Sequence, residues 1–297
     1  MRLDPNVLGY GFGDRMTDGA WLQGIFLTIY VREKFCPAEI RERRRFIKTL
    51  PRKLGPYLTD VLPIGEMRAC LLDHHDTFAS THTRAAAALL VNSPQGPLAL
   101  LSGHVALPRR PKELVHTWDA GTGDVEVRAH DKGSGDAFTG RLLAGRFGAG
   151  RAIDWAVARI DAPAAKLDLR HHGVDRAPPL TTATIQSYTT GTTVRYHSPA
   201  RGGKRIEATI ANRVESLAVR VAEGYPRAHY TDLLLVDTAG DVEFSVRGDS
   251  GSLVFDRHDR AIGMVVANST GTAGAIATLH ALVRDPVFAP LAQLFFR

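Results

Sequence analysis

The chain has 297 residues, of which 44% are hydrophobic and 23% are charged, proportions that exclude a mainly disordered protein. Two cysteines, Cys36 and Cys70, are too few for a disulfide scaffold, and no run of about 18 apolar residues predicts a membrane span. The N-terminus lacks the apolar core of a signal peptide. We therefore expect a cytoplasmic protein with reduced thiols.

Residues 1–67 are predicted to form a small α+β extension with a candidate regulatory role. The glycine-rich run Gly9–Gly13 lacks the spacing of a dinucleotide site and is predicted to be a turn. Gly24–Phe35 is rich in β-branched and aromatic residues, which predicts a strand. Pro37 is typical of the first turn of a short helix, and Thr59–Met67 predicts a second strand.

The net charge of +6 is partly concentrated between residues 41 and 53, where seven Lys and Arg side chains accompany a single acid, Glu42. Such a run is most often a solvated surface. A docking surface and a protease-sensitive linker remain alternatives. Nucleic-acid binding would rest on charge alone, so we do not favour it.

Short apolar runs, separated by Gly, Pro, Asn, Asp and Thr, recur from residue 68 onward without helical periods. This pattern predicts an all-β barrel or sandwich. The runs are Ala86–Asn92, Pro97–Gly103, Ile153–Ile160, Ala208–Glu215, Asp232–Asp237, Ser252–Asp256, Ala261–Asn268 and Gly274–Leu279. The last 19 residues, from Leu279, are the best helix candidate, and Pro286 and Pro290 limit it to short pieces.

The segment Arg247–Ser252 carries the clearest chemical signal, a serine between glycines. Glycine lets the backbone turn tightly and present N–H groups beside the Ser250 hydroxyl. Acyl transfer needs such donors, because its tetrahedral intermediate carries an oxyanion. The amides of Gly248 and Ser250 are the candidate donors. On its own, the motif also fits a β-hairpin turn.

A serine nucleophile needs a base and a carboxylate that orients the base. His104 follows an apolar run and a glycine, which makes it the candidate base among twelve histidines. Asp154 begins another apolar run, where a buried acid is costly unless it is paired. Taken singly, each residue is more typical of a structural position. Their order and spacing together favour a catalytic triad.

With these motifs in the order His, Asp, Ser, the chain resembles the chymotrypsin/trypsin-fold serine peptidases, and in particular bacterial trypsin-like peptidases. Ser102–Val105 is similar to the histidine motif of that family, and Asp154–Val157 to its aspartate motif. Ile262–Val266 resembles the strand that lines the substrate cleft, and Gly274–Ala277 the strand behind it. The resemblance covers residues 68–297.

The resemblance implies two antiparallel six-stranded β-barrels, preceded by the extension and followed by a short C-terminal helix. His104 and Asp154 would come from the first barrel and Ser250 from the second. It implies a serine endopeptidase that forms an acyl-enzyme on a protein or peptide substrate, without metal or cofactor. A regulatory protein partner is a further expectation.

The chain also departs from the family pattern. Val105 stands where animal enzymes have a disulfide cysteine, and no Ile-Val-Gly-Gly sequence is present to supply a new N-terminus on cleavage. Asp249 therefore needs another partner to hold the oxyanion hole.

The substrate pocket is predicted from position relative to Ser250. Phe244, six residues upstream, would form the floor, and Val266, Ala267 and Asn268 would form the wall. This arrangement favours an uncharged P1 residue. A small shift in the alignment would place Asp241 or Glu243 there instead, as trypsin-like cleavage requires.

Two other classes of function were weighed. The histidine pairs at 74–75 and 171–172 are weak metal candidates, because adjacent residues of an extended chain point in opposite directions. The main alternative is a catalytically silent peptidase-like protein that acts as a binding module, although such a module has no need of a complete triad.

Overall fold

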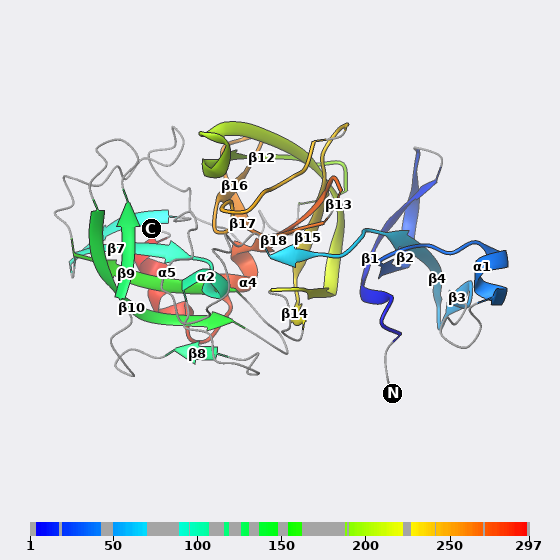
Figure 1. The fold of residues 1–297 in the computed structure, drawn as a ribbon, viewed down its shortest axis with the longest axis horizontal. Coiled ribbons are helices and arrows are strands. Elements are labelled where there is room, and N and C mark those ends of the chain that lie inside the picture. Colours follow the sequence, from blue (N-terminus) through cyan, green and yellow to red (C-terminus); the bar gives the residue numbers. More distant parts are fainter. Residues whose placement is uncertain are drawn as a thin grey trace.

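The computed structural model describes most of the chain and consists mainly of strands with a few short helices. Along the long axis, Figure 1 shows a first sheet with the C-terminal helices, a barrel in the middle and the N-terminal extension at the other end. The described residues are 4–17, 20–42, 50–69, 89–94, 96–106, 116–118, 126–130, 137–147, 154–161, 188, 190–221, 227–240, 242–269 and 271–295.

Six strands form a closed barrel. They are β12 (Thr193–Ser198), β13 (Lys204–Val219), β15 (Leu233–Asp237), β16 (Leu253–Asp256), β17 (Ala261–Asn268) and β18 (Ala273–Thr278). The hydrogen-bonded order is β12-β16-β17-β18-β15-β13, and β13 pairs back onto β12 to close the ring. Buried and exposed side chains alternate along much of β13, so one of its faces fills the barrel.

The first sheet also has six described strands. They are β6 (Leu89–Ser93), β7 (Gly96–Leu101), β8 (His116–Trp118), β9 (Glu126–His130), β10 (Ala137–Phe147) and β11 (Trp155–Ile160). Their order is β6-β7-β11-β10-β8, with β9 on β10. No pairing between the described residues closes this sheet. One of the two expected barrels is therefore present, and the other stays a prediction.

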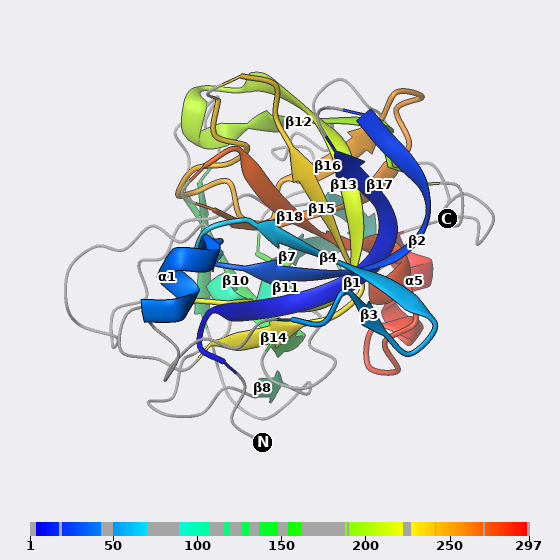
Figure 2. The ribbon, with the colours of Figure 1, turned by 90° about the vertical axis from the view of Figure 1, so that its right-hand side faces the viewer.

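The N-terminal extension continues the sheet of the closed barrel. Its elements are β1 (Val7–Thr17), β2 (Ala20–Val31), α1 (Pro37–Glu42), β3 (Lys53–Leu54) and β4 (Tyr57–Pro63). Strand β4 runs parallel to β2, and β1 runs antiparallel to β13. Figure 2 shows β1, β2 and β4 in front of the barrel strands. The boundary at residue 67 remains a prediction.

The glycine-rich run that was predicted to be a turn is instead part of strand β1. A Cβ atom on Gly9 would lie 2.0 Å from the carbonyl oxygen of Ser216 on β13. A Cβ on Gly11 would lie 2.3 Å from the carbonyl oxygen of Arg213. The prediction was wrong because these glycines serve the close approach of two strands rather than a change of direction.

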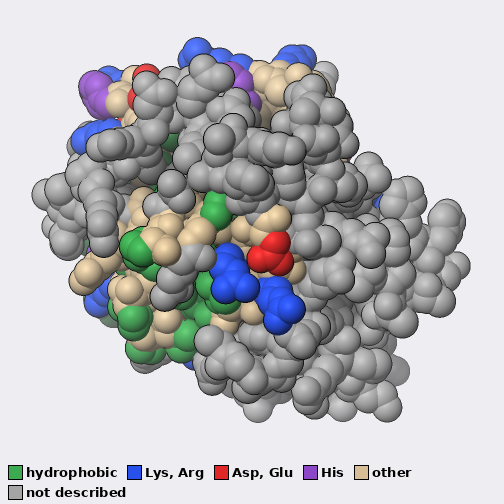
Figure 3. All heavy atoms as spheres, turned by 90° about the vertical axis from the view of Figure 1, so that its left-hand side faces the viewer, with side chains coloured by type: hydrophobic (Ala, Val, Ile, Leu, Met, Phe, Trp, Pro, Cys, Tyr) green, Lys and Arg blue, Asp and Glu red, His purple; other side chains and the backbone are tan. Residues whose placement is uncertain are grey.

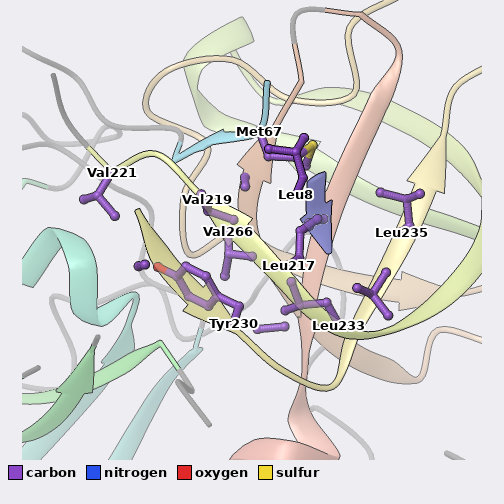
Figure 4. Packing of buried hydrophobic residues seen from close by; sticks show 14 of the residues in the cluster. Leu8, Met67, Leu217, Val219, Val221, Tyr230, Leu233, Leu235 and Val266 are labelled. Carbon is purple, nitrogen blue, oxygen red and sulfur yellow. The ribbon is translucent and has the colours of Figure 1, made fainter. Parts of the chain in front are cut away.

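A shared hydrophobic core joins the extension to the barrel. Leu8 and Met67 come from the N-terminal part of the chain, whereas Leu217 and Val266 come from barrel strands (Figure 4). All four side chains are buried.

Two short strands lie in the same region. Strand β5 (Arg68–Ala69) pairs with β17, and β14 (Ala228–Tyr230) pairs with β13.

A second core joins the first sheet to the barrel. Trp155 of β11 and Met264 of β17 belong to one cluster with Phe288, whose ring lies 5.0 Å from that of Trp155. Phe288 lies between the helices α4 (Leu279–Val283) and α5 (Ala289–Phe295), which are short, as the two prolines predict. Figure 3 views this end of the molecule, where hydrophobic side chains of described residues lie next to basic and acidic ones.

The described helices are short, and α5 has seven residues. None of them is long and apolar enough to cross a bilayer.

Candidate active site

His104 lies in a single helical turn directly after a strand of the first sheet. Strand β7 ends at Leu101, and the turn α2 (Gly103–Ala106) follows Ser102. A Cβ on Gly103 would lie 2.6 Å from the carbonyl oxygen of Arg146 and 2.8 Å from that of Trp155. Glycine at this position therefore lets the turn approach β10 and β11, which brings the buried His104 beside the start of β11.

Asp154 holds His104 through both carboxylate oxygens. Its Oδ1 accepts a hydrogen bond from the backbone N–H of His104 at 2.7 Å, and its Oδ2 is hydrogen-bonded to His104 Nδ1. The hydroxyl of Tyr230 on β14 donates to Oδ2 at 3.3 Å. Asp154 and His104 are both fully buried. Because one carboxylate oxygen bonds the backbone of His104 and the other bonds its ring, the orientation of the imidazole is fixed. The second ring nitrogen, Nε2, then points away from the carboxylate.

Ser250 completes a hydrogen-bonded line. Its Oγ lies 2.8 Å from His104 Nε2, so the structure brings together three residues that are 50 and 146 positions apart along the chain. Ser250 is also fully buried. A hydroxyl at this distance from an imidazole nitrogen can pass its proton to that nitrogen as the oxygen attacks a carbonyl carbon.

Two consecutive turns present the Ser250 hydroxyl. Asp249 N–H donates to Val246 O at 3.1 Å, and Ser252 N–H donates to Asp249 O at 2.9 Å. The third residue of each turn is a glycine with positive φ, 97° at Gly248 and 85° at Gly251. These left-handed conformations explain why the serine is flanked by glycines.

The same turns hold the two candidate oxyanion donors. The N–H groups of Gly248 and Ser250 donate to no acceptor within the described part of the chain, whereas the neighbouring N–H of Gly251 donates to Val265 O at 2.9 Å. These two N–H groups belong to Ser250 itself and to a residue two positions before it. They are therefore available to donate to an oxygen atom of a bound molecule.

Asp249 has the partners that the sequence left open. The Ser198 hydroxyl donates to Oδ1 at 2.6 Å, and the N–H of Ala200 lies 3.2 Å from the same oxygen. The Tyr196 hydroxyl and the N–H of Val246 each lie 3.0 Å from Oδ2. Within the described residues, no Lys, Arg or His side chain is ion-paired with this buried carboxylate. Neutral donors thus stabilise its charge.

The four residues predicted for the substrate pocket have different environments. Phe244 is fully buried in the barrel, with its ring centroid 5.2 Å from that of Tyr196. Val266 and Ala267 are also fully buried, in the core shared with the extension. Only Asn268 is partly exposed, and its buried Oδ1 has no hydrogen-bond partner in the described part of the molecule. The pocket assignment stays a prediction.

Sequence reasoning missed Tyr196, Ser198 and Tyr230. The first two lie on β12 and the third on β14, and each reaches the site through strand pairing with β13. Tyr196 alternates with exposed or half-buried neighbours along β12, which marks it as inward-facing. Nothing in the local sequence marks any of the three as a partner of a carboxylate.

Other candidate features can be placed only in part. Cys36 is an exposed free cysteine. Cys70, both histidine pairs and residues 43–49 of the basic run lie outside the described residues. Within the part of the chain that is described, no three His, Cys, Asp or Glu side chains are grouped to hold a metal ion.

Comparison with known proteins gives little further information. No family model and no curated protein matches the chain. A solved structure of the HtrA-type protease AlgW, a variant with a tripeptide, shares 18% sequence identity and a TM-score of 0.36; the match covers 70% of this chain and 62% of that chain. A likeness at this level carries no argument about activity. The pairing of its strands gives the chain a β-barrel fold, and one of its structural neighbours is an HtrA-type protease.

Proposed function

We propose that the chain is a serine endopeptidase that cleaves protein or peptide substrates through Ser250, His104 and Asp154. The observation that carries the proposal is the hydrogen-bonded line from Asp154 through His104 to the Ser250 hydroxyl. Three residues from distant parts of the chain form this line, and their side chains are of the three types that acyl transfer by a serine nucleophile uses. We further propose that the protein works in the cytoplasm, where an exposed thiol such as Cys36 stays reduced.

The proposed reaction has two steps. Ser250 Oγ attacks the scissile carbonyl carbon while His104 Nε2 takes the hydroxyl proton, and Asp154 stabilises the resulting imidazolium. The amides of Gly248 and Ser250 donate to the oxyanion. His104 then gives its proton to the leaving amine, which leaves an acyl group on Ser250. In the second step, His104 Nε2 takes a proton from a water molecule as the water oxygen attacks the ester carbon. His104 then returns that proton to Ser250 Oγ as the ester bond breaks, which releases the acid and restores the serine.

Burial of the site adds a condition to this proposal. Ser250 and His104 are fully buried, so a substrate carbonyl can contact the hydroxyl only after neighbouring groups move. We therefore propose that the enzyme is regulated, with the extension or a protein partner promoting an open form. A peptide that binds at the site would promote the same form by binding it selectively.

Labelling with a small fluorophosphonate tests the proposal. The labelling is done once without an activator and once with a pool of peptides as activator. We expect wild-type protein to be labelled in at least one of these conditions and Ser250→Ala protein to remain unlabelled in both. Ser252→Ala is the matched control: Ser252 is a buried serine two residues away whose hydroxyl has no described partner, and its removal should preserve labelling. Equal labelling of wild type and Ser250→Ala, or no labelling of wild type under either condition, would contradict the proposal.

The full burial of Ser250 also favours a second candidate, a silent peptidase-like protein that binds other proteins. The two candidates differ in turnover. An endopeptidase releases new amino termini from casein at a rate that depends on Ser250, whereas a binding module releases none from casein or from a mixed peptide pool.

A further inference from the structure

Four arginine side chains surround one carboxylate where the chain passes from the extension to the barrel. Glu66 Oε1 lies 2.9 Å from an Nη2 atom of Arg220, 3.1 Å from that of Arg227 and 3.6 Å from that of Arg32. Glu66 Oε2 lies 3.2 Å from Nη2 of Arg68. We call these five residues the arginine cluster. No role in the proposed peptidase reaction uses any of them.

The cluster holds more positive charge than its carboxylate can balance. Glu66 is the one acid that the described residues bring within ion-pair distance of these four guanidinium groups, which leaves an excess of three positive charges. Arg227 is only 19% exposed, so its charge is poorly screened by water. Like charges at this spacing repel one another, and a bound anion would relieve that repulsion.

The arginines also have hydrogen-bond donors to spare. A guanidinium has five N–H groups, whereas a carboxylate has about four acceptor positions. Each arginine contacts Glu66 through one Nη2 atom. The Nε of Arg32 is buried and has no described hydrogen-bond partner. Unpaired buried donors cost free energy, so this atom marks a position that an acceptor would satisfy.

The backbone that carries the cluster is held in place by hydrogen bonds. Arg220 N–H donates to Met67 O at 2.8 Å, and Ala69 N–H donates to Arg220 O at 2.9 Å. Arg32 N–H donates to Asn6 O at 3.0 Å. These bonds hold the backbone of Arg220 beside Met67 and Ala69, so Arg68 and Arg220 extend from neighbouring backbone positions before any ligand arrives, which lowers the cost of binding.

We propose that the arginine cluster is a binding site for a phosphate-type oxyanion. Planar guanidinium groups bind phosphate oxygens in pairs, and several of them together select a tetrahedral dianion over chloride. Arg68, which is 55% exposed, gives the ligand access from solvent. Glu66 acts as an internal counterion that keeps the site formed when it is empty. A bound anion ties Arg32 of the extension to Arg220 and Arg227 of the barrel.

Calorimetric titration of the full chain with inorganic phosphate tests this proposal, with chloride adjusted to hold ionic strength constant. We expect saturable binding that weakens by about tenfold or more in Arg220→Gln and in Arg68→Gln. Glu66→Gln should bind phosphate about tenfold more tightly, because the competing negative charge is gone. Phosphate should also raise the melting temperature, and raise it most in Glu66→Gln.

Arg205→Gln is the matched control, since Arg205 is as exposed as Arg68 but pairs with a single acid, Glu207. It should bind phosphate as the wild type does. A titration with phosphoserine distinguishes the source of the ligand: tighter binding than inorganic phosphate indicates a phosphate monoester, and weaker binding indicates the free ion. The absence of saturable binding of either anion, or full affinity in both Arg220→Gln and Arg68→Gln, would overturn the proposal. These measurements need no peptidase activity, so their outcome is independent of the proposed function.

Discussion

An Asp154→Asn variant should cleave its substrate about 10⁴-fold more slowly than the wild type, with little change in the melting temperature. The asparagine oxygen can still accept from the backbone N–H of His104, which lies 2.7 Å from Oδ1 in the wild type. Its NH₂ group then faces Nδ1 and forces the proton onto Nε2. That nitrogen can no longer accept from the Ser250 hydroxyl. The rate constant kcat, measured on a peptide that the wild type cleaves, checks this expectation.

A matched control distinguishes the contact of Asp154 with the imidazole from its contact with a neighbouring hydroxyl. Tyr230→Phe removes only the hydroxyl that lies 3.3 Å from Asp154 Oδ2 and leaves both contacts with His104 in place. The loss of one long hydrogen bond should lower kcat by about tenfold at most. A small effect of Asp154→Asn, or equal effects of the two variants, would mean that Asp154 does not orient a catalytic base.

An Asp249→Asn variant should have a kcat about 10²- to 10³-fold lower than the wild type, which is the usual cost of losing one oxyanion donor. An amide in place of the buried carboxylate puts new N–H donors among groups that already donate, such as Ser198 Oγ and Val246 N. The turn that carries Gly248 and Ser250 should shift in response. Kinetics with a soluble peptide and a melting curve measure the two consequences separately.

The hydroxyl partners of Asp249 provide graded variants for the same test. Ser198→Ala removes a 2.6 Å hydrogen bond to the carboxylate. Tyr196→Phe removes a hydroxyl that lies 3.0 Å from Asp249 Oδ2 and 2.6 Å from Phe244 O, while the carboxylate remains. Each single variant should lower kcat less than Asp249→Asn does. The double variant should lower kcat almost as much as Asp249→Asn does. Unchanged kcat in all of these variants, with melting temperatures reduced, would assign Asp249 a purely structural role.

If these neutral donors hold the oxyanion hole, then the enzyme needs no new N-terminus for that purpose. In the family that the sequence resembles, cleavage supplies a charged amine to the aspartate that corresponds to Asp249. The Ile-Val-Gly-Gly sequence that would supply this amine is not found in the sequence given. The uncleaved protein should therefore reach full activity once its site is opened.

Local signals in the sequence predicted strand segments and marked Ser250, whereas His104 and Asp154 were named from order and spacing; the structure places the three side chains in one hydrogen-bonded line. Apolar runs bounded by turn residues mark strands such as β15 and β17. A serine between glycines indicates a strained turn, and Gly248 and Gly251 both have the positive φ that such a turn requires. Order along the chain then selected His104 and Asp154 from many other candidates.

The features that the sequence did not predict depend on contacts between distant segments. The Gly9–Gly13 run is a strand because β1 pairs with β13. No local sequence pattern predicts which strand will lie beside a glycine. Tyr196 and Ser198 contact Asp249 from about 50 residues away because β12 passes beside the serine turn. The arginine cluster likewise combines Arg32, which follows β2, with Arg68 of β5 and with Arg220, which follows β13.

The most direct test of the central claim is to locate the covalent adduct that the proposed mechanism predicts between the protein and a slowly hydrolysed ester. The reaction is quenched with acid during turnover, the protein is digested, and the acylated peptide is identified by mass spectrometry. The proposed mechanism predicts an acyl group on Ser250, at about one per active site. An acyl group on a different residue during turnover would show that the line of Asp154, His104 and Ser250 does not carry out the reaction.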